Sequence, residues 1–268
     1  MLKKDPYRIF ARSLSPVGLY ARQKWLGEGN EAAWKNDFDR GVTRLLSGQS
    51  DDGSWNQSVK TTIQRLFGLH LTVRNPTQPI DKALGWLMAL AFKEYSPIRK
   101  DISQRITSRD LENLPFTPGC FGYFLLGATL FLASIFGRED DTRVQEAYAR
   151  LNQEGIKKKG RWCGWSCNNN VLRAFVVHPR YSESRATELA VHALSRVQDD
   201  SGKWPRVVPF YQTVNALAHL DSPTARRQVA KAFRHLLRTQ NPDGTWGRSR
   251  KEWNTFLVVH ALRRKRLL

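Results

Sequence analysis

The side chains best placed for chemistry fall in four short stretches, each about six to eight residues after a tryptophan or its equivalent. They are Lys60, Thr61 and Thr62; Asn168, Asn169 and Asn170; Gln212 and Thr213; and Trp253, Asn254 and Thr255. Amides and hydroxyls hydrogen-bond a ligand, but they do not deliver a proton to an alkene. The one carboxylate on the helices that these stretches open is Glu252, which is therefore the single candidate general acid. Cations beside it favour its ionised form and predict an ordinary ion-paired role.

Cationic side chains gather at the same ends of these helices. They are Lys60, Arg161, Lys203, Arg206, Arg248, Arg250 and Lys251. Helix N-termini present free N–H groups, and guanidinium groups match phosphate oxygens. We therefore predict a basic mouth in which Lys60, Arg161, Arg206, Arg248 and Arg250 bind an anion. A solvated charged rim is the equal alternative.

Cysteines and histidines form two separate sets. Cys120, Cys163 and Cys167 lie at the tryptophan end of their repeats, whereas His70, His178, His219 and His260 come 14 to 16 residues after it. At a rise of ~1.5 Å per residue, the sets lie on the order of 20 Å apart along the helices and do not share a metal. We expect buried thiols, no metal and no cofactor. A zinc site made of the three cysteines alone is the alternative.

These stretches are positioned by a repeated motif, Gln-x-x-x-Gly-x-Trp. It occurs at Gln49, Gly53 and Trp55, at Gln198, Gly202 and Trp204, and at Gln240, Gly244 and Trp246. Trp204 and Trp246 are 42 residues apart, and steps of similar size reach Gly160–Trp162 and Gly119–Phe121, two eroded copies. We expect the glycine to end an outer helix, the glutamine to bond its free end groups and the tryptophan to cover the joint.

The segments QSDDGSW, QDDSGKW and QNPDGTW resemble the repeats of the squalene cyclase and protein prenyltransferase superfamily of terpenoid enzymes. The resemblance covers residues 32–262. It implies an all-α fold, an α/α-toroid in which inner and outer helices alternate around a central cavity. The chain lacks the family's Asp-x-Asp-Asp cyclase acid at the aligned positions and its Asp, Cys and His zinc ligands. Asp140, Asp141, Asp199 and Asp200 are read as helix-start and turn residues.

Apolar periodicity supports about five inner and five outer helices. The outer helices are predicted at 32–46, 81–92, 141–151, 182–197 and 223–239, and the inner ones at 57–73, 120–136, 166–177, 208–220 and 250–262. Residues 1–30 form an N-terminal helical extension on the outside of the ring, and residues 31–268 form one toroid domain. Residues 93–118 are an insertion with a short helix near 101–106. It is either a cover for a site or a surface excursion.

The composition points to anionic partners. A net charge of +19 on a chain that is 41% hydrophobic indicates a folded basic protein. Three cysteines and the lack of an apolar leader predict a cytoplasmic location, with peripheral membrane contact through the basic, aromatic N-terminal segment. The apolar residues 119–137 are expected to form a buried inner helix rather than a membrane span.

Two functions follow from these expectations. The first is a toroid that binds an isoprenoid or other lipidic anion, such as a prenyl diphosphate, in its central cavity without ordinary class II cyclase acid chemistry. The alternative is a non-catalytic module that binds nucleic acid or an acidic partner, with the run Arg263–Arg266 reaching phosphates. Whether the protein is an enzyme at all is left open by the missing acid.

Overall fold

The chain is all-α over the residues that the computed structural model describes, which are 2–93, 106–107 and 109–268. The α-helices are α1 (Pro16–Lys24), α2 (Ala32–Leu46), α3 (Val59–Thr72), α4 (Gln78–Lys93), α5 (Phe121–Ile135), α6 (Thr142–Lys157), α7 (Trp165–Phe175), α8 (Arg185–Ser195), α9 (Phe210–Ala218), α10 (Pro223–Arg238) and α11 (Lys251–Arg264). Short 3-10 helices span Glu28–Asn30 and Tyr181–Glu183. In place of strands, the described residues contain one isolated antiparallel bridge between Gln49 and Trp55.

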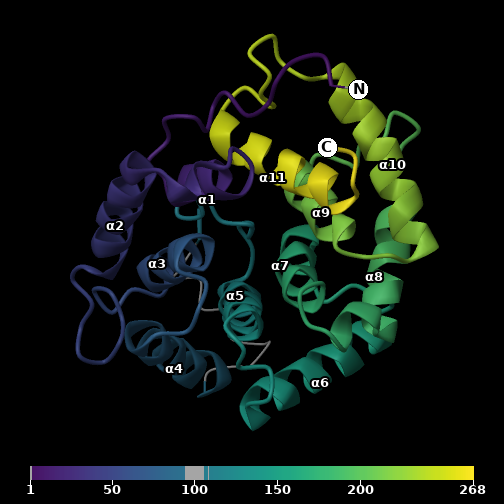
Figure 1. Cartoon of the computed structure of the whole chain (residues 1–268). Coiled ribbons are helices and arrows are strands. Elements are labelled where there is room, and N and C mark those ends of the chain that lie inside the picture. Colours follow the sequence, from purple (N-terminus) through teal and green to yellow (C-terminus); the bar gives the residue numbers. More distant parts are fainter. Residues whose placement is uncertain (1, 94–105, 108) are drawn as a thin grey trace.

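The helices alternate between two layers (Figure 1). α2, α4, α6, α8 and α10 lie outside, and α1, α3, α5, α7, α9 and α11 lie inside. Each inner helix packs on the next, and α11 packs on α1, so the inner layer is continuous. The predicted helix order is therefore present, although α6 runs six residues past its predicted end at Leu151.

The N-terminal segment differs from the prediction. It was expected outside the ring, but α1 is an inner helix between α3 and α11. Its Tyr20 ring packs edge-on against Phe256 of α11, at 5.4 Å between centroids. The sequence predicted about five inner helices plus N-terminal helical segments, and α1 is the N-terminal segment that joins the inner layer. The α1 segment carries no motif of its own, so the repeat gave no sign of its layer.

The motif tryptophans fasten each outer helix to the turn that follows it. Their rings are at most 6% exposed. Each indole N–H donates to a carbonyl at or near the end of the preceding outer helix: Trp55 to Ser47, Trp162 to Leu151, Trp204 to Leu194 and Trp246 to Leu236, at 2.7–3.2 Å. Each indole thus ties its turn to the backbone of the helix before it.

The glutamine and glycine connect the turn to the next outer helix. Gln49 Nε2 donates to the carbonyl of Pro79 in α4, and Gln198 Nε2 to that of Gln228 in α10. A Cβ added to Gly53 or Gly202 would overlap the backbone of those same helices, at Lys82 and Lys231. Both glycines have left-handed φ, +90° and +89°. The close approach of two backbones, as well as the turn, therefore requires glycine there.

In the last copy of the motif the N-terminal segment takes the place of a next outer helix. Gln240 Nε2 donates to the carbonyl of Lys4, and its Oε1 accepts from the backbone N–H groups of Lys3 and Lys4. Gly244 lies against the backbone oxygen of Asp5. These contacts join the two ends of the repeat array.

The two eroded copies have different outcomes. Gly160 has a φ of +81° and lies against Leu189 of α8, so Gly160–Trp162 is a true joint without its glutamine. Gly119 is not among the residues with positive φ, and Phe121 is the first residue of α5. The assignment of a fifth copy at Gly119–Phe121 was therefore wrong, because the insertion replaces that joint.

The described part of the insertion enters the interior, with a continuous buried stretch at 114–117. Leu111, Leu114 and Phe116 are at most 2% exposed. The segment is held to α3 by Gln64, which donates to the carbonyl of Asp110, and to α7 by Asn169, which donates to that of Pro115. It thus spans the inner layer at the N-terminal ends of the inner helices. The short helix predicted near 101–106 lies almost entirely outside the described residues.

The apolar helix α5 is short and enclosed. It has 15 residues, of which Tyr123 to Ala133 are all buried. Among the described residues, no helix combines the length and apolar character that crossing a bilayer demands.

Removing a motif indole should be costly. Replacing Trp204 or Trp246 by Ala is expected to lower the free energy of unfolding by ~3–5 kcal/mol, the range for a buried aromatic side chain. Trp246→Phe keeps most of the volume and removes one hydrogen bond to the Leu236 carbonyl, which still accepts from the Thr239 N–H, so it should cost only about 0.5–1.5 kcal/mol. Urea denaturation measures both, and a loss below ~1 kcal/mol for Trp246→Ala would disprove the joint.

Closure of the array should depend on Gly244. Gly48→Ala is the matched control, because Gly48 has a φ of +72° but open space around it; it should cost ~1–2 kcal/mol of left-handed strain. Gly244→Ala adds a clash with Asp5, so residues 3–10 should lose amide hydrogen-exchange protection as well. Equal exchange at residues 3–10 in the two variants would contradict this closure.

Candidate functional site

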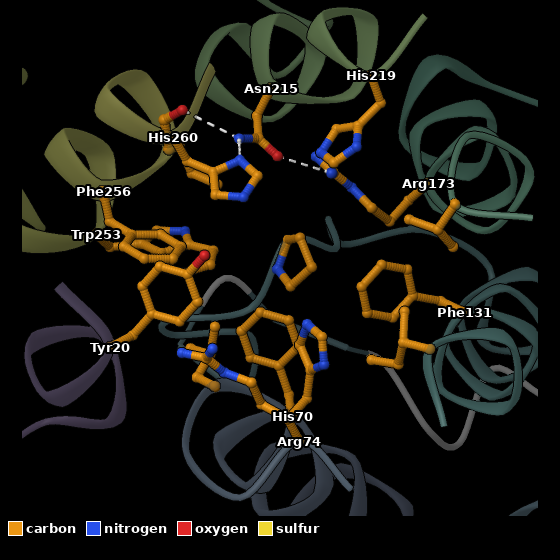
Figure 2. A pocket seen from close by; sticks show the side chains of 16 residues that line it. Tyr20, His70, Arg74, Phe131, Arg173, Asn215, His219, Trp253, Phe256 and His260 are labelled. Atoms are coloured by element: carbon orange, nitrogen blue, oxygen red, sulfur yellow. Dashed lines mark hydrogen bonds between the residues drawn. The ribbon is translucent and has the colours of Figure 1, made fainter. Parts of the chain in front are cut away.

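A cavity of about 310 Å³ lies at the centre of the inner layer (Figure 2). Every inner helix contributes to its wall. Aromatic side chains form much of this wall: Tyr20, Phe67, Phe131, Trp253 and Phe256. Trp253 and Phe256 stack with centroids 5.6 Å apart, and Phe67 meets Trp253 edge-on at 5.9 Å. Pro115 from the insertion also lines the cavity.

Two arginines face the cavity from opposite walls (Figure 2). Arg173, near the end of α7, is 3% exposed, and burial lowers its pKa to about 9. It still carries a charge at neutral pH. Arg74, two residues after α3, lies over the Tyr20 ring at 4.8 Å and donates to Gln23 Oε1 at 3.0 Å. Burial lowers its pKa as well.

A hydrogen-bonded chain orients one side of the cavity. Arg173 Nη1 donates to Asn215 Oδ1 at 2.8 Å, and Nη2 donates to the Gln212 carbonyl at 3.0 Å. Because a guanidinium only donates, the Asn215 oxygen must face it. Asn215 Nδ2 then donates to the Leu257 carbonyl and to His260 Nδ1 at 3.2 Å. The neutral His260 ring therefore carries its proton on Nε2, which is turned toward the cavity in Figure 2.

Three histidines line the cavity in their neutral form. Burial, reinforced by nearby arginines, lowers the pKa of His70 and of His260 to about 4. Burial and the neighbouring His260 lower the pKa of His219 well below its usual value. The His219 and His260 rings are stacked, with centroids 5.4 Å apart.

The cavity is rich in polar groups that lack a partner and poor in acids. Within the described residues, four buried nitrogens on its walls have no hydrogen-bond partner: His70 Nδ1, Arg74 Nε, Arg173 Nε and Trp253 Nε1. None of the 16 lining residues is an aspartate or a glutamate. An unpaired buried donor costs ~1–3 kcal/mol, and two of these nitrogens belong to guanidinium groups, so the lining offers unsatisfied donors beside positive charge.

Few of the residues predicted for binding reach this cavity. Trp253 lines it, and Gln212 contributes its backbone carbonyl to Arg173. Asn169 and Asn170 are buried but hold the insertion, with Asn170 Oδ1 accepting from the Thr117 backbone N–H at 2.8 Å. Asn254 Nδ2 donates to the Ser249 carbonyl in its own turn.

The polar residues six to nine positions after each tryptophan have a structural role instead. Thr62, Asn168 and Thr255 accept from the backbone N–H groups of Trp55, Trp162 and Trp246, at 3.0–3.2 Å. They stabilise the motif turn from the following inner helix. Their recurrence in the sequence therefore reflects the repeat and not a ligand.

The predicted cationic mouth is not assembled around the cavity. Lys60 pairs with Asp110 at 3.1 Å, and Arg161 stacks over Trp165 at 4.2 Å. Arg206 and Arg248 are exposed, and Arg250 is the left-handed residue before α11. The insertion, with Pro115 in the cavity wall, lies at the end of the inner helices where this mouth was expected.

Glu252 does not line the cavity either. Its Oε1 accepts from Ser15 Oγ, the N-cap of α1, at 3.1 Å. No ion pair of Glu252 occurs among the described residues, so the predicted ion-paired role is replaced by a hydrogen bond. The two acidic pairs have the local roles predicted for them: Asp141 caps α6, and Asp199 accepts from the Lys203 N–H within its turn.

Arg74, Arg173, Asn215 and Tyr20 were missed by sequence reasoning. The four residues lie in different parts of the chain, and no regular spacing in the sequence relates them to one another. The histidine set was the available signal, because His70, His219 and His260 recur at similar distances from their tryptophans and all three line the cavity. The fourth, His178, accepts the Arg180 and Tyr181 backbone N–H groups through Nδ1 and has a structural role.

Comparison with known proteins adds information on the fold. No family model matches the chain, and no curated protein matches it. A solved structure described as a protein from Actinoplanes superposes with a TM-score of 0.56 at 16% identity, over 93% of this chain and 88% of that one. At this identity the likeness shows a shared fold alone.

The neutral histidines predict an acid-sensitive fold. The folded pKa of His70 is about 4 against an unfolded value of 6.5, so the unfolded chain binds the extra proton between these values. Its contribution to stability is present above pH 6.5 and is lost as the pH falls toward 4. The loss should be on the order of 2–3 kcal/mol at pH 4.5.

The matched variant is His70→Phe. It removes the titratable nitrogens and keeps an aromatic ring that can contact Phe67, Phe131 and Phe136. Urea denaturation at pH 7 and at pH 4.5 should show a smaller loss of stability in this variant than in the wild type. An identical loss would mean that His70 titrates normally in the folded protein.

Proposed function

We propose that the two helix layers form an α/α-toroid and that its central cavity binds a small anion with an apolar body. The proposal rests on one observation above all. The cavity presents two guanidinium groups and four unpartnered nitrogens, and no carboxylate is among its lining residues.

The charge arrangement favours an anionic group. Buried cations are normally paired, because an unpaired buried charge carries a large desolvation cost. Among the described residues, Arg173 has Asn215 and the Gln212 carbonyl as partners, and Arg74 has Gln23 and the Tyr20 ring. A phosphate or carboxylate between them would accept from the free Nε groups and from His260 Nε2, which completes the hydrogen bonding of this lining.

The walls favour an apolar and unsaturated body. Phe67, Phe131, Trp253 and Phe256 offer ring faces and edges, and the volume of about 310 Å³ is at the lower end of the range for small-molecule sites. A short prenyl diphosphate combines both features. It is also the class of ligand that the resemblance of the Gln-x-x-x-Gly-x-Trp motifs implies.

Acid-initiated cyclisation is not part of this proposal. Protonation of an alkene requires a strong acid at the substrate, and the lining supplies neutral histidines, an amide and arginines. We therefore propose ligand binding, or chemistry initiated at the anionic group, and leave the reaction unassigned. A reducing, cytoplasmic compartment fits the three free thiols.

Calorimetry with geranyl diphosphate tests the proposal. Arg74→Met removes a partly exposed guanidinium without disturbing the Arg173 chain, and it should weaken binding about 10- to 100-fold through loss of a charge-assisted hydrogen bond. Arg206→Met is the matched control at the mouth predicted from the sequence and should leave the affinity unchanged. Geraniol and pyrophosphate, each carrying half of the ligand, should both bind more weakly than the intact molecule.

Two outcomes would overturn this assignment. One is equal weakening by Arg74→Met and Arg206→Met. The other is absence of binding together with salt-sensitive binding of DNA, which would favour the interaction-module alternative. Glu252→Gln should change neither binding nor any turnover of the ligand, because its partner is Ser15. Loss of turnover in that variant, with affinity intact, would restore an acid mechanism.

A further inference from the structure

The three cysteines of the chain converge at one point of the fold. Their Sγ atoms all lie within 4.8 Å of one another. Cys120 is the N-cap residue of α5, Cys163 lies just before α7, and Cys167 is in the first turn of α7. None of them lines the central cavity. In the described part of the chain, no histidine or carboxylate joins this cluster.

The spacing matches a thiolate–metal site. Tetrahedral zinc with Zn–S bonds of ~2.3 Å places its sulfurs about 3.8 Å apart. Cys120 Sγ and Cys163 Sγ are 3.9 Å apart. They are therefore close to the separation that one shared ion requires, whereas a disulfide requires ~2.05 Å.

The backbone around the cluster offers groups that suit a metal-bound thiolate. The backbone N–H of Cys120 donates to Cys167 Sγ at 3.3 Å, which is the kind of hydrogen bond that stabilises a metal-bound thiolate. Cys120 and Cys167 also lie at the N-terminal ends of α5 and α7, where the helix dipole is positive. Gly119 permits this approach, because a Cβ there would lie only 3.1 Å from Cys167 Sγ.

The exposure of the cluster suits a site with an open position. Cys167 is buried, while Cys120 and Cys163 are exposed to solvent. Zinc with three thiolates has a net charge of −1. The basic connector with Lys157, Lys158, Lys159 and Arg161 directly precedes Cys163 and offsets such a charge.

We propose that Cys120, Cys163 and Cys167 bind one zinc ion, with the fourth coordination position open to solvent or to an exogenous ligand. The site connects the start of α5 to the start of α7 across the joint from which the motif is missing. It is independent of the ligand proposed for the central cavity.

Cobalt(II) titration of the reduced full-length protein tests this site. The wild type should bind one equivalent with a sulfur-to-cobalt charge-transfer band and tetrahedral visible bands, and one equivalent of zinc should bleach them. Cys120→Ser and Cys163→Ser, both at exposed positions, should each weaken binding by at least about 100-fold while the melting temperature of the metal-free protein is unchanged. His192→Gln, which removes an exposed histidine, is the matched control and should bind as the wild type does.

Three results would each overturn the proposal. The first is no stoichiometric metal in the reduced wild type. The second is bound cobalt without a sulfur band, which would indicate histidine ligands. The third is a charge-transfer band that survives in both exposed serine variants. Cys167→Ser perturbs a buried position and is used only to confirm the loss.

Discussion

The fold depends on the close contact between each motif glycine and the backbone of the next outer helix. A side chain at Gly53, Gly160 or Gly202 would overlap that backbone, and the left-handed φ of these residues disfavours one as well. The contact fixes the spacing of neighbouring outer helices, and the buried tryptophan then fastens the turn to the helix before it. The next inner helix is attached to each of these turns by a polar side chain that accepts from the tryptophan backbone N–H. These side chains are Thr62, Asn168 and Thr255. Repetition of one joint thus fixes how far apart neighbouring helices lie, and therefore where the inner helices place the cavity residues.

The polar lining of the central cavity lowers the stability of the fold, whereas the joints raise it. In the part of the chain that the structure describes, Arg173 is nearly fully buried without an acidic partner. Burial lowers the pKa of His70 and of His260 to about 4, so both rings are neutral at pH 7. Groups with strongly shifted pKa values and unpaired donors concentrate at functional sites, because a ligand completes their interactions. The insertion adds to this arrangement by filling the N-terminal ends of the inner helices with Leu111, Leu114 and Phe116. The polar lining therefore lies toward the opposite ends, near the last turns of α3, α7 and α9.

Sequence reasoning succeeded where the signal was local and repeated. Apolar periodicity located the helices from α2 to α11, and the motif located four of the joints. It did not place α1 in the inner layer, because the contacts of α1 with α3 and α11 leave no periodic trace in the sequence. It also attributed ligand binding to Asn169, Asn170 and the mouth cations, since recurrence after each tryptophan marks structural as well as functional residues. Arg74, Arg173 and Asn215 are brought together only by the arrangement of inner helices in space, and no spacing along the chain encodes that.

The attachment of Lys3, Lys4 and Asp5 to Gln240 and Gly244 has a consequence for how the protein is made. These contacts join residues more than 230 positions apart. At ~5–20 residues per second, the ribosome reaches the last joint roughly tens of seconds after the first residues emerge. During that interval α2 and α3 have been synthesised but α11 has not. The rings of Tyr20 and Trp25 therefore lack their contact with Phe256. The nascent chain therefore exposes this aromatic face to solvent until α11 has left the exit tunnel.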